Sequence, residues 1–238
     1  EKCKTIVHEL EDAENIAGLL QSEVQGKLMV SSSVAFGRRV LTPLVLQFMG
    51  QHPQLQVSLN LDDRYINLVE EGVDLAIRMG RLSDSSLGAR FLGLNPWVVV
   101  ATPEYLEKNG TPSIPSDLSK HIALIYSSVQ GDHRWQFTGR DGSNKSIQVS
   151  GPLYSNNLST LLAATRNHLG IAALPWYVAY SSVQSRHLKP LLADWSLPAQ
   201  EIHAVFSSPR LVPTKVSMLI DWLAGQFRGN WWTQEIGS

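Results

Sequence analysis

Hydrophobic residues near the start of the chain recur at alternating intervals of three and four. Seven positions form the series: Cys3, Ile6, Leu10, Ala13, Ala17, Leu20 and Val24. This spacing predicts a helix over residues 1–25 with one narrow apolar seam, ended at Gly26. Such a seam fits either packing on the helix's own domain or pairing with a partner helix. Because the seam is narrow and carries alanines at its centre, we favour a dimerising helix that uses the positions from Ile6 to Val24.

After Lys27 the pattern alternates between strand-like and helix-like segments. Strands are expected at 28–31, 57–61, 75–79 and 97–101, and helices at 34–51 and 66–71. The longer helix is expected to bend or restart at Pro43, and the shorter one to stop at Gly72. This order predicts parallel strands joined by right-handed helical crossovers.

The second half of the chain alternates in a similar way. Expected strands lie at 122–126, 171–174, 188–192 and 202–206, with a hairpin formed by 135–138 and 146–149. A helix over 158–168 is expected to be capped by Asn156 or Asn157 and to end at Gly170. A long amphipathic helix follows at 213–227. The predicted fold class is therefore α/β.

Composition narrows the class of protein further. Of 238 residues, 43% are hydrophobic and 17% are charged, which is typical of a folded globular chain. Twenty Lys and Arg against 21 Asp and Glu give a net charge of -1, a balance that does not favour direct binding to nucleic acid. No apolar run approaches the roughly 20 residues that span a bilayer. The single cysteine, Cys3, excludes an internal disulfide and favours a reducing compartment.

Residue patterns for catalysis are mostly absent from the sequence. It has no glycine-rich phosphate loop and no G-x-S-x-G motif, and its seven histidines lack metal-ligand spacing. Asp62 and Asp63 form the only adjacent carboxylate pair that follows a predicted strand. This pair fits a solvated turn, a polar group at the edge of a binding cleft, or an acid–base pair. We therefore expect that the protein is not an enzyme and that it binds neither a cofactor nor a metal ion.

Two polar segments indicate binding instead. Ser31–Ser33 lies between the first strand and the first long helix, and Tyr154–Asn157 precedes the helix at 158–168. Hydroxyls and free backbone N–H groups at a helix N-terminus accept anions. In parallel α/β sheets ligands bind at the carboxyl ends of strands, where both segments are expected to lie. Two such segments in two domains would define a site if they faced each other.

Four longer stretches stand in a distinctive order. They are D-R-x-x-N-L-V-E-E-G-V-D-L-A-I-R-M-G at 63–80, D-S-S-L-x-A-R at 84–90, L-G-I-A-A-L-P at 169–175 and P-x-K-V-x-x-x-I-D-W-L at 213–223. In these blocks and in their order, the chain resembles the LysR-type transcriptional regulators.

The resemblance implies a type 2 periplasmic-binding-protein fold, with two Rossmann-like lobes joined by a hinge. Lobe I would comprise residues 27–102 and 202–230, and lobe II residues 103–201, with crossings near Thr102–Pro103 and Pro198–Ile202. Residues 1–26 would be the linker helix that dimerises the protein. A winged helix-turn-helix would precede Glu1, which fits the neutral charge of this chain.

In this family a small-molecule effector binds between the lobes. Carried over by position, the expected contacts are Ser32, Ser33, Asp62, Asp63 and Thr102, and from lobe II Ser127, Ser128, Asn156, Asn157, Leu174 and Pro175. Family members often sense anionic metabolites, which suits helix N-termini. Asp62 and Asp63 would repel an anion unless a cation such as Arg78 offsets them, so the charge of the effector stays open.

Two classes of protein share this fold: the effector-binding part of a transcriptional regulator and a transport-type solute-binding protein. The heptad helix favours the regulator, because a secreted receptor has no need of one. We expect a cytoplasmic protein, without membrane contact, that forms a homodimer or tetramer and reaches DNA through the upstream domain. Effector binding would shift lobe closure and so the placement of two DNA-binding modules.

Overall fold

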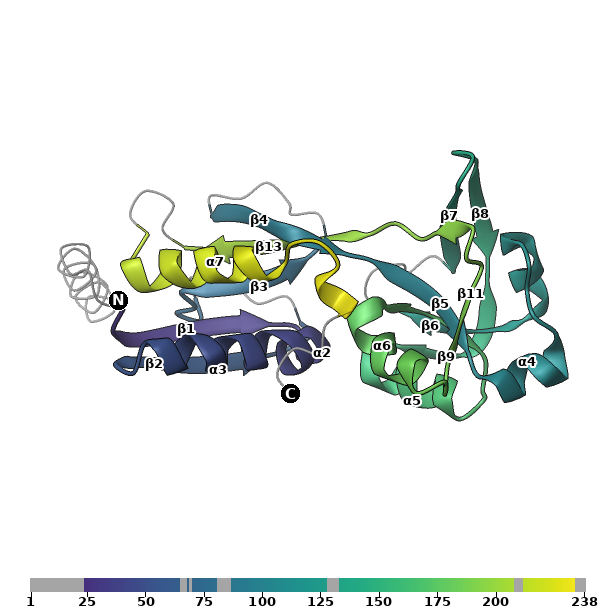
Figure 1. The fold of residues 1–238 in the computed structure, drawn as a ribbon, viewed down its shortest axis with the longest axis horizontal. Helices are drawn as coiled ribbons and strands as arrows, with labels where there is room; N and C mark the ends of the chain where they lie inside the picture. Colours follow the sequence, from purple (N-terminus) through teal and green to yellow (C-terminus); the bar gives the residue numbers. More distant parts are fainter. Residues whose placement is uncertain are drawn as a thin grey trace.

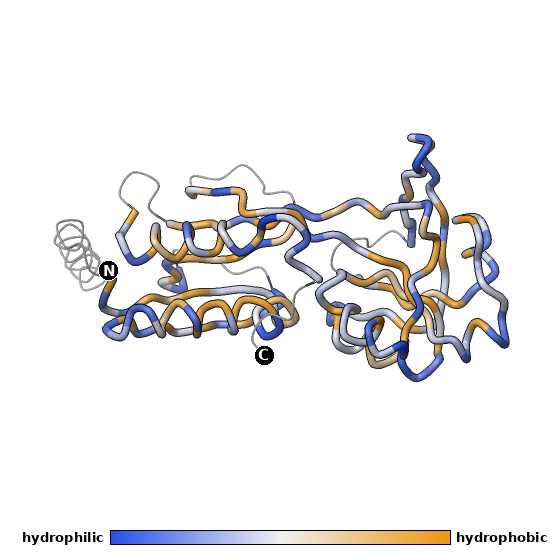
Figure 2. The backbone as a smooth tube through the Cα atoms, in the orientation of Figure 1, coloured by the Kyte–Doolittle hydropathy of each residue, from blue (hydrophilic) through white to orange (hydrophobic). Residues whose placement is uncertain are grey.

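The computed structural model describes residues 24–64, 68, 70–80, 87–127, 133–207 and 212–233. These residues fold into two α/β lobes that lie end to end and are joined by two crossing segments (Figure 1). The most hydrophobic parts of the backbone lie in the strands inside each lobe, whereas the tip of the hairpin at one end of the molecule is hydrophilic (Figure 2). Each lobe therefore has its own core.

Lobe I is built on a five-stranded sheet in the order β2-β1-β3-β13-β4. Its strands are β1 (Gly26–Ser32), β2 (Leu55–Leu61), β3 (Leu75–Met79), β4 (Gly88–Asn95) and β13 (Gln200–Phe206). β1 pairs in parallel with β2 and β3, as the strand–helix–strand order predicts, and β13 runs antiparallel to β3 and β4. The register of β1 and β2 sets Ser32 beside Leu61, so both strands end at the same edge of the sheet.

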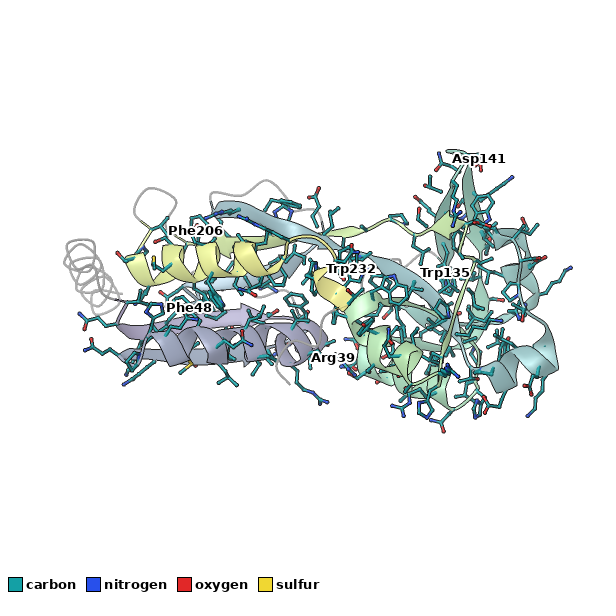
Figure 3. All side chains as sticks on the ribbon, in the orientation of Figure 1. Arg39, Phe48, Trp135, Asp141, Phe206 and Trp232 are labelled. Carbon is teal, nitrogen blue, oxygen red and sulfur yellow. The ribbon has the colours of Figure 1, made fainter. Side chains whose placement is uncertain are left out.

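Helices of lobe I pack on one face of this sheet. They are α2 (Val34–Phe36), a π-helical turn (Gly37–Leu41), α3 (Thr42–Gln51) and α7 (Thr214–Gln226). The first three form one helical segment, and α3 begins beside Pro43, as predicted, because proline has no N–H to donate to the preceding turn. Phe48 of α3 and Leu219 of α7 share a core with Leu28 of β1 (Figure 3).

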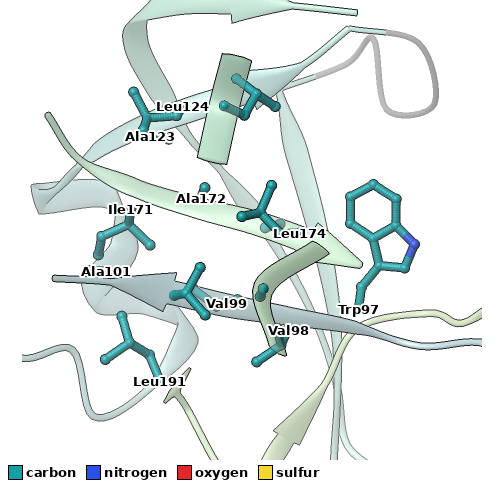
Figure 4. Packing of buried hydrophobic residues seen from close by; sticks show 14 of the residues in the cluster. Trp97, Val98, Val99, Ala101, Ala123, Leu124, Ile171, Ala172, Leu174 and Leu191 are labelled. Atoms are coloured by element: carbon teal, nitrogen blue, oxygen red, sulfur yellow. The ribbon is translucent and has the colours of Figure 1, made fainter. Parts of the chain in front are cut away.

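Lobe II contains a second five-stranded sheet in the order β11-β5-β10-β6-β9. Its strands are β5 (Trp97–Ala101), β6 (Ile122–Tyr126), β9 (Ser150–Ser155), β10 (Ile171–Pro175) and β11 (Lys189–Leu191). β6, β9 and β10 are parallel, and β5 runs antiparallel to β10. Side chains from β5, β6, β10 and β11 meet in the core, among them Val99, Leu124 and Leu191 (Figure 4).

The remaining elements of lobe II surround this sheet. They are α4 (Pro103–Asn109), a 3-10 helix η2 (Pro115–Lys120), the hairpin β7 (Arg134–Gly139) and β8 (Asn144–Gln148), α5 (Leu158–Arg166), α6 (Trp176–Gln184) and β12 (Trp195–Ser196). The predicted hairpin is confirmed, with β12 as a third strand beside β7. β4, β9 and α6 were not predicted, and β9 carries Pro152, which an edge strand tolerates.

The chain enters lobe II earlier than the sequence predicts. Residues 97–101 form β5 in the second sheet, so the first crossing lies at Pro96 rather than near Thr102–Pro103. Proline cannot donate to a strand ladder and separates β4 from β5, and the five successive buried residues of β5 suit an interior strand. The chain returns between β12 and β13, at residues 197–199.

Two predicted helices differ from those in the structure. Three of the six positions of the predicted helix at 66–71 lie outside the described residues, and the other three, 68, 70 and 71, are turns rather than helix. α5 ends at Arg166, two residues before the predicted end at His168, and His168 adopts a left-handed φ of 61°. None of the described helices is long and apolar enough to span a membrane.

The predicted dimerisation seam is described only at its last position. Ile6, Leu10, Ala13, Ala17 and Leu20 lie outside the described residues. Val24 is 6% exposed and belongs to the core of lobe I with Leu28. Burial of its side chain favours the alternative that Val24 packs on its own domain, and its place in a dimerisation seam stays a prediction.

The two crossing segments are tied together where they leave lobe I. Gln200 Oε1 accepts hydrogen bonds from Asn95 Nδ2 at 3.2 Å and from Trp97 Nε1 at 2.9 Å. Asn95 and Trp97 flank Pro96 on the first crossing, and Gln200 begins the strand after the second. One glutamine side chain therefore joins both crossings at the hinge.

An aromatic cluster also connects the lobes. It consists of Phe36, Tyr177, Phe227, Trp231 and Trp232. Trp231, in the 3-10 helix η3 (Trp231–Thr233), stacks on Tyr177 of lobe II at 6.3 Å and meets Phe36 of lobe I edge-on at 6.1 Å. Its Nε1 donates to the carbonyl oxygen of Leu94 at 2.8 Å. The segment after α7 thus holds lobe II against lobe I.

Candidate functional site

The carboxyl ends of strands from both lobes meet at one place, which we call the interlobe junction. On the lobe I side, β1 and β2 end at Ser32 and Leu61, directly before the helical segment that starts at Val34. On the lobe II side, the parallel strands β6, β9 and β10 end together, and α5 starts after β9. Ligands of open α/β sheets bind at such strand ends.

The lobe I side of the junction is organised by Asp63. Ser33 is the N-cap residue of the helical segment, but its own side chain makes no capping hydrogen bond. Instead, Asp63 Oδ1 accepts the N–H of Val34 at 2.9 Å. Because β1 and β2 are parallel neighbours, the residues after β2 lie beside the start of this helix, and a carboxylate is stabilised there by the helix dipole.

The lobe II side is organised by Asn157. Its Oδ1 accepts the N–H groups of Ser159 at 3.0 Å and Thr160 at 3.2 Å, so Asn157 and not Asn156 caps α5. With the amide oxygen engaged, the amide nitrogen faces lobe I and lies 3.5 Å from Asp63 Oδ2. Asn157 of the segment 154–157 therefore faces Asp63, which caps the helical segment that follows Ser33, so the starts of the two helices lie close together.

Asp62 has a different partner from Asp63. Its carboxylate is bound by Arg64, with 2.7 Å between Oδ2 and Nη2, and also accepts the backbone N–H of Arg64 at 2.8 Å. Hydrogen bonds from Arg64 lower the pKa of Asp62 to about 2, with a smaller contribution from Arg78. Arg64 is thus engaged by Asp62.

Ser31 and Ser32 add two enclosed hydroxyl groups. Their side chains are 1% and 0% exposed. Neither Oγ has a hydrogen-bond partner among the described residues. Buried hydroxyls without partners are costly, so these positions are suited to a further hydrogen-bonding group.

Two ionisable side chains near the junction were not identified from the sequence. Arg39 is half-buried, and burial, with the nearby charge of Arg38, lowers its pKa (Figure 3). Burial raises the pKa of Tyr177, whose ring meets Phe36 edge-on at 5.4 Å. Tyr177 lies in the unpredicted helix α6, and the Pro175–Trp176 step after a buried strand was the available signal for a helix start.

One predicted effector contact, Thr102, lies away from the junction. Thr102 is 2% exposed, and its Oγ1 accepts the N–H of Tyr105 at 3.3 Å and lies 2.8 Å from His168 Nδ1. His168 follows the far end of α5, whereas the junction lies at its start. Because β5 runs antiparallel to β10, the carboxyl end of β5 points away from lobe I, and the assignment of Thr102 was wrong.

Other predicted lobe II contacts differ in exposure. Ser127 and Asn156 are exposed, and the N–H of Ser127 donates to the carbonyl oxygen of Ser155 at 3.0 Å. Leu174 is fully buried in the lobe II core, and Pro175 is the N-cap residue of α6. Ser128 lies outside the described residues. Within the described part of the chain, no group of His, Cys, Asp and Glu could hold a metal ion.

Two mixed α/β lobes, two crossings and polar strand ends at their junction define a ligand-binding domain of the type 2 periplasmic-binding-protein class. Residues 21–228 match the family model described as "LysR substrate binding domain". The chain therefore belongs to the LysR substrate-binding domain family.

Similar proteins of known description are transcriptional regulators. The chain is 32% identical over 217 residues to an uncharacterised HTH-type transcriptional regulator of Haemophilus influenzae, covering 91% of this chain and 75% of that protein. It is 34% identical over 206 residues to the HTH-type transcriptional regulator DmlR of Escherichia coli, covering 85% and 66%. These relatives are not enzymes, and they favour a regulator over a transport protein.

Solved structures agree with this assignment. The regulatory domain of CrgA, a LysR-type transcriptional regulator from Neisseria meningitidis, matches with a TM-score of 0.75 at 30% identity, over 85% of this chain and 99% of that chain. The full-length Vibrio cholerae virulence activator AphB shares the fold, with a TM-score of 0.76 at 24% identity, over 94% and 77%. LysR-type regulators bind small-molecule effectors, form oligomers and bind DNA through an N-terminal domain.

Proposed function

We propose that this chain senses a small-molecule effector at the interlobe junction. The observation that carries the proposal is the approach of Asp63 Oδ2 and Asn157 Nδ2, which brings together the polar strand ends of both lobes. Ser32, Ser33, Asp63 and Asn157 would form the centre of the site. Ser127, Asn156 and Pro175 would line its lobe II side, at the same sheet edge.

Effector binding would act on DNA through the angle between the lobes. A ligand shifts such an equilibrium only by binding one arrangement more tightly than the other. Contacts that span the junction have this property, because they exist only when the lobes are close. The full protein would carry a winged helix-turn-helix before Glu1, reside in the cytoplasm and associate through its linker helix as a dimer or tetramer.

A calorimetric screen of small metabolites, followed by variants, tests the site. For a metabolite that binds, Ser33→Ala should weaken affinity by about 1 kcal/mol, the usual value of one hydrogen bond. Thr102→Ser is the matched control, because it preserves the cap of α4 far from the junction and should leave affinity unchanged. Unchanged affinity in Ser33→Ala would remove that residue from the site, and a loss in Thr102→Ser would move the site to the other end of lobe II.

The proposed role of the linker helix has its own test. Removing residues 1–23 keeps Val24, which belongs to the lobe I core, and should shift the molecular mass measured by light scattering toward the monomer. An unchanged mass distribution would contradict a dimerising role for the heptad positions Ile6 to Leu20.

A further inference from the structure

The carboxylate of Asp63 occupies the N-terminus of the lobe I helical segment, where a bound anion would be expected. Its Oδ1 accepts the Val34 N–H at 2.9 Å at the start of the lobe I helical segment, and its Oδ2 lies 3.5 Å from Asn157 Nδ2 of lobe II. Helix N-termini attract anions because their first N–H groups lack partners within the helix. Here the chain's own side chain already fills that position.

On the facing side of the junction, the side chain of Asn157 presents a hydrogen-bond donor to lobe I. Its Oδ1 is held by the N–H groups of Ser159 and Thr160, so α5 is capped from within and only the amide nitrogen is presented to lobe I. An anion entering between the lobes would therefore find the start of α5 already capped. It would also lie within a few ångströms of the Asp63 charge.

An enclosed hydroxyl lies beside the same position. Val30 and Leu28 of β1 face the helical layer of lobe I, and strand alternation places Ser32 on that face, at the start of the helical segment. Its side chain is fully buried, and its Oγ has no hydrogen-bond partner among the described residues. A hydroxyl both donates and accepts, so this group can bind an uncharged polar ligand.

Arg64, the next residue along the chain, is engaged by Asp62. Arg64 is bound to Asp62 through both its side chain and its backbone N–H. A carboxylate at the junction attracts hydrogen-bond donors and repels other carboxylates.

We propose that Asp63 determines the chemical class of effector: the junction accepts a group that donates hydrogen bonds, a hydroxyl or an ammonium, and excludes a carboxylate. An inserted hydroxyl donates to Asp63 Oδ2 and accepts from Asn157 Nδ2, which requires the lobes to separate slightly around it. An ammonium has no acceptor and pairs with Asp63 Oδ2 alone. A carboxylate at the same place faces a like charge at hydrogen-bond distance. This inference rests on the effector site proposed above.

Two small molecules, one a carboxylate and one an amine, test on the full chain whether the junction excludes the first and admits the second. Sodium acetate and ethanolamine hydrochloride are titrated at constant ionic strength, and the amide signals of Val34 and of the Asn157 side chain are followed by ¹H–¹⁵N NMR. Asp63→Asn keeps an oxygen for the Val34 N–H but removes the charge. It should bind acetate at least about tenfold more tightly than the wild type, and ethanolamine about tenfold more weakly.

Asp141→Asn is the matched control, because it removes one carboxylate charge at the tip of the β7–β8 hairpin, away from the junction (Figure 3). It should change either affinity less than about twofold. Asp63→Ser, which also leaves a capping oxygen, serves if Asp63→Asn does not fold and should show the same reversal. Equal acetate affinity in the wild type and the Asp63 variant, an equal effect of Asp141→Asn, or no response of Val34 and Asn157 to either probe would each overturn the proposal. These outcomes are separate from failure of the effector site, because that site is tested by the screened metabolite and Ser33→Ala.

Discussion

Asn157 Nδ2 lies 3.5 Å from Asp63 Oδ2, so two residues 94 positions apart join the starts of two helices in different lobes. Each side chain also serves its own lobe, because Asp63 caps the helical segment at Val34 and Asn157 caps α5. A carboxylate and an amide have nearly the same shape, so the two residues can be exchanged without loss of either cap.

Exchanging the pair is therefore a sharp test of the contact. Asn157→Asp alone sets two carboxylates against each other and should lower the free energy of unfolding by about 1 kcal/mol. The double variant Asn157→Asp with Asp63→Asn restores one donor and one acceptor and should recover most of this loss. Urea unfolding of the four proteins measures the coupling.

Asn156→Asp is the control for this cycle. It introduces the same charge one residue earlier, at an exposed position, and should change stability by less than about 0.5 kcal/mol. If the double variant were as unstable as the sum of its single changes, Asp63 and Asn157 would not interact.

Arg64 controls the ionisation of Asp62. Removing it in Arg64→Ala should raise the pKa of Asp62 from about 2 toward its ordinary value of 3.8. Because the folded-state pKa is depressed, the contribution of this pair is present above pH 3.8 and is lost as the pH falls through 2. Carboxyl ¹³C shifts of Asp62 over pH 1.5 to 6 follow the change. A pKa that stays near 2 in the variant would show that Arg64 is not the cause.

Trp231 should matter more to stability than its neighbour Trp232. Trp231 is 1% exposed and donates to the Leu94 carbonyl, whereas Trp232 is half-buried. Trp231→Phe should lower the free energy of unfolding by about 2 kcal/mol, since it removes packing and leaves a carbonyl oxygen unpaired. Trp232→Phe should cost less than about 1 kcal/mol. Similar costs in denaturant unfolding would mean that the aromatic cluster is not centred on Trp231.

Much of the fold was predictable because the signal for each of these strands lies in its own stretch of sequence. The strands at 75–79, 97–101 and 122–126 match β3, β5 and β6, whose buried hydrophobic runs have no other plausible environment. α6 was missed because its moderately apolar sequence directly follows β10 without a turn residue. Strand partners were also not predictable, which is why β5 was assigned to the wrong lobe.

Residues of the candidate site were predictable where the signal is local in the sequence, and not where it depends on strand pairing. Ser33, Asp63 and Asn157 could be named because polar residues after a strand are a local signal. Thr102 carries the same signal, but β5 is antiparallel to its neighbour, and strand direction is not a local property. That Asp63 itself fills the helix N-terminus depends on the pairing of β1 with β2, which only the folded chain reveals.

Gly151 should be intolerant of a side chain. A Cβ at this position would overlap the backbone carbonyl of Ala123 in the neighbouring strand β6, which cannot move without breaking the sheet. Gly151→Ala should therefore lower the free energy of unfolding by about 2 kcal/mol or more. Gly225→Ala is the control, because nothing lies near its Cβ in α7 and alanine favours helix by up to about 1 kcal/mol. Thermal unfolding compares the two, and a stable Gly151→Ala would contradict the close packing of β9 on β6.

An amide map of effector binding decides whether the effector binds between the two lobes. A metabolite found by calorimetry is added to ¹⁵N-labelled protein, and the shifts of the backbone amides are recorded. The largest changes should fall at Ser33, Val34, Asn157 and Ser159, at the junction of the two lobes. Changes gathered instead around Thr102 and His168 or on the β7–β8 hairpin, with those four amides unmoved, would contradict an effector site between the lobes.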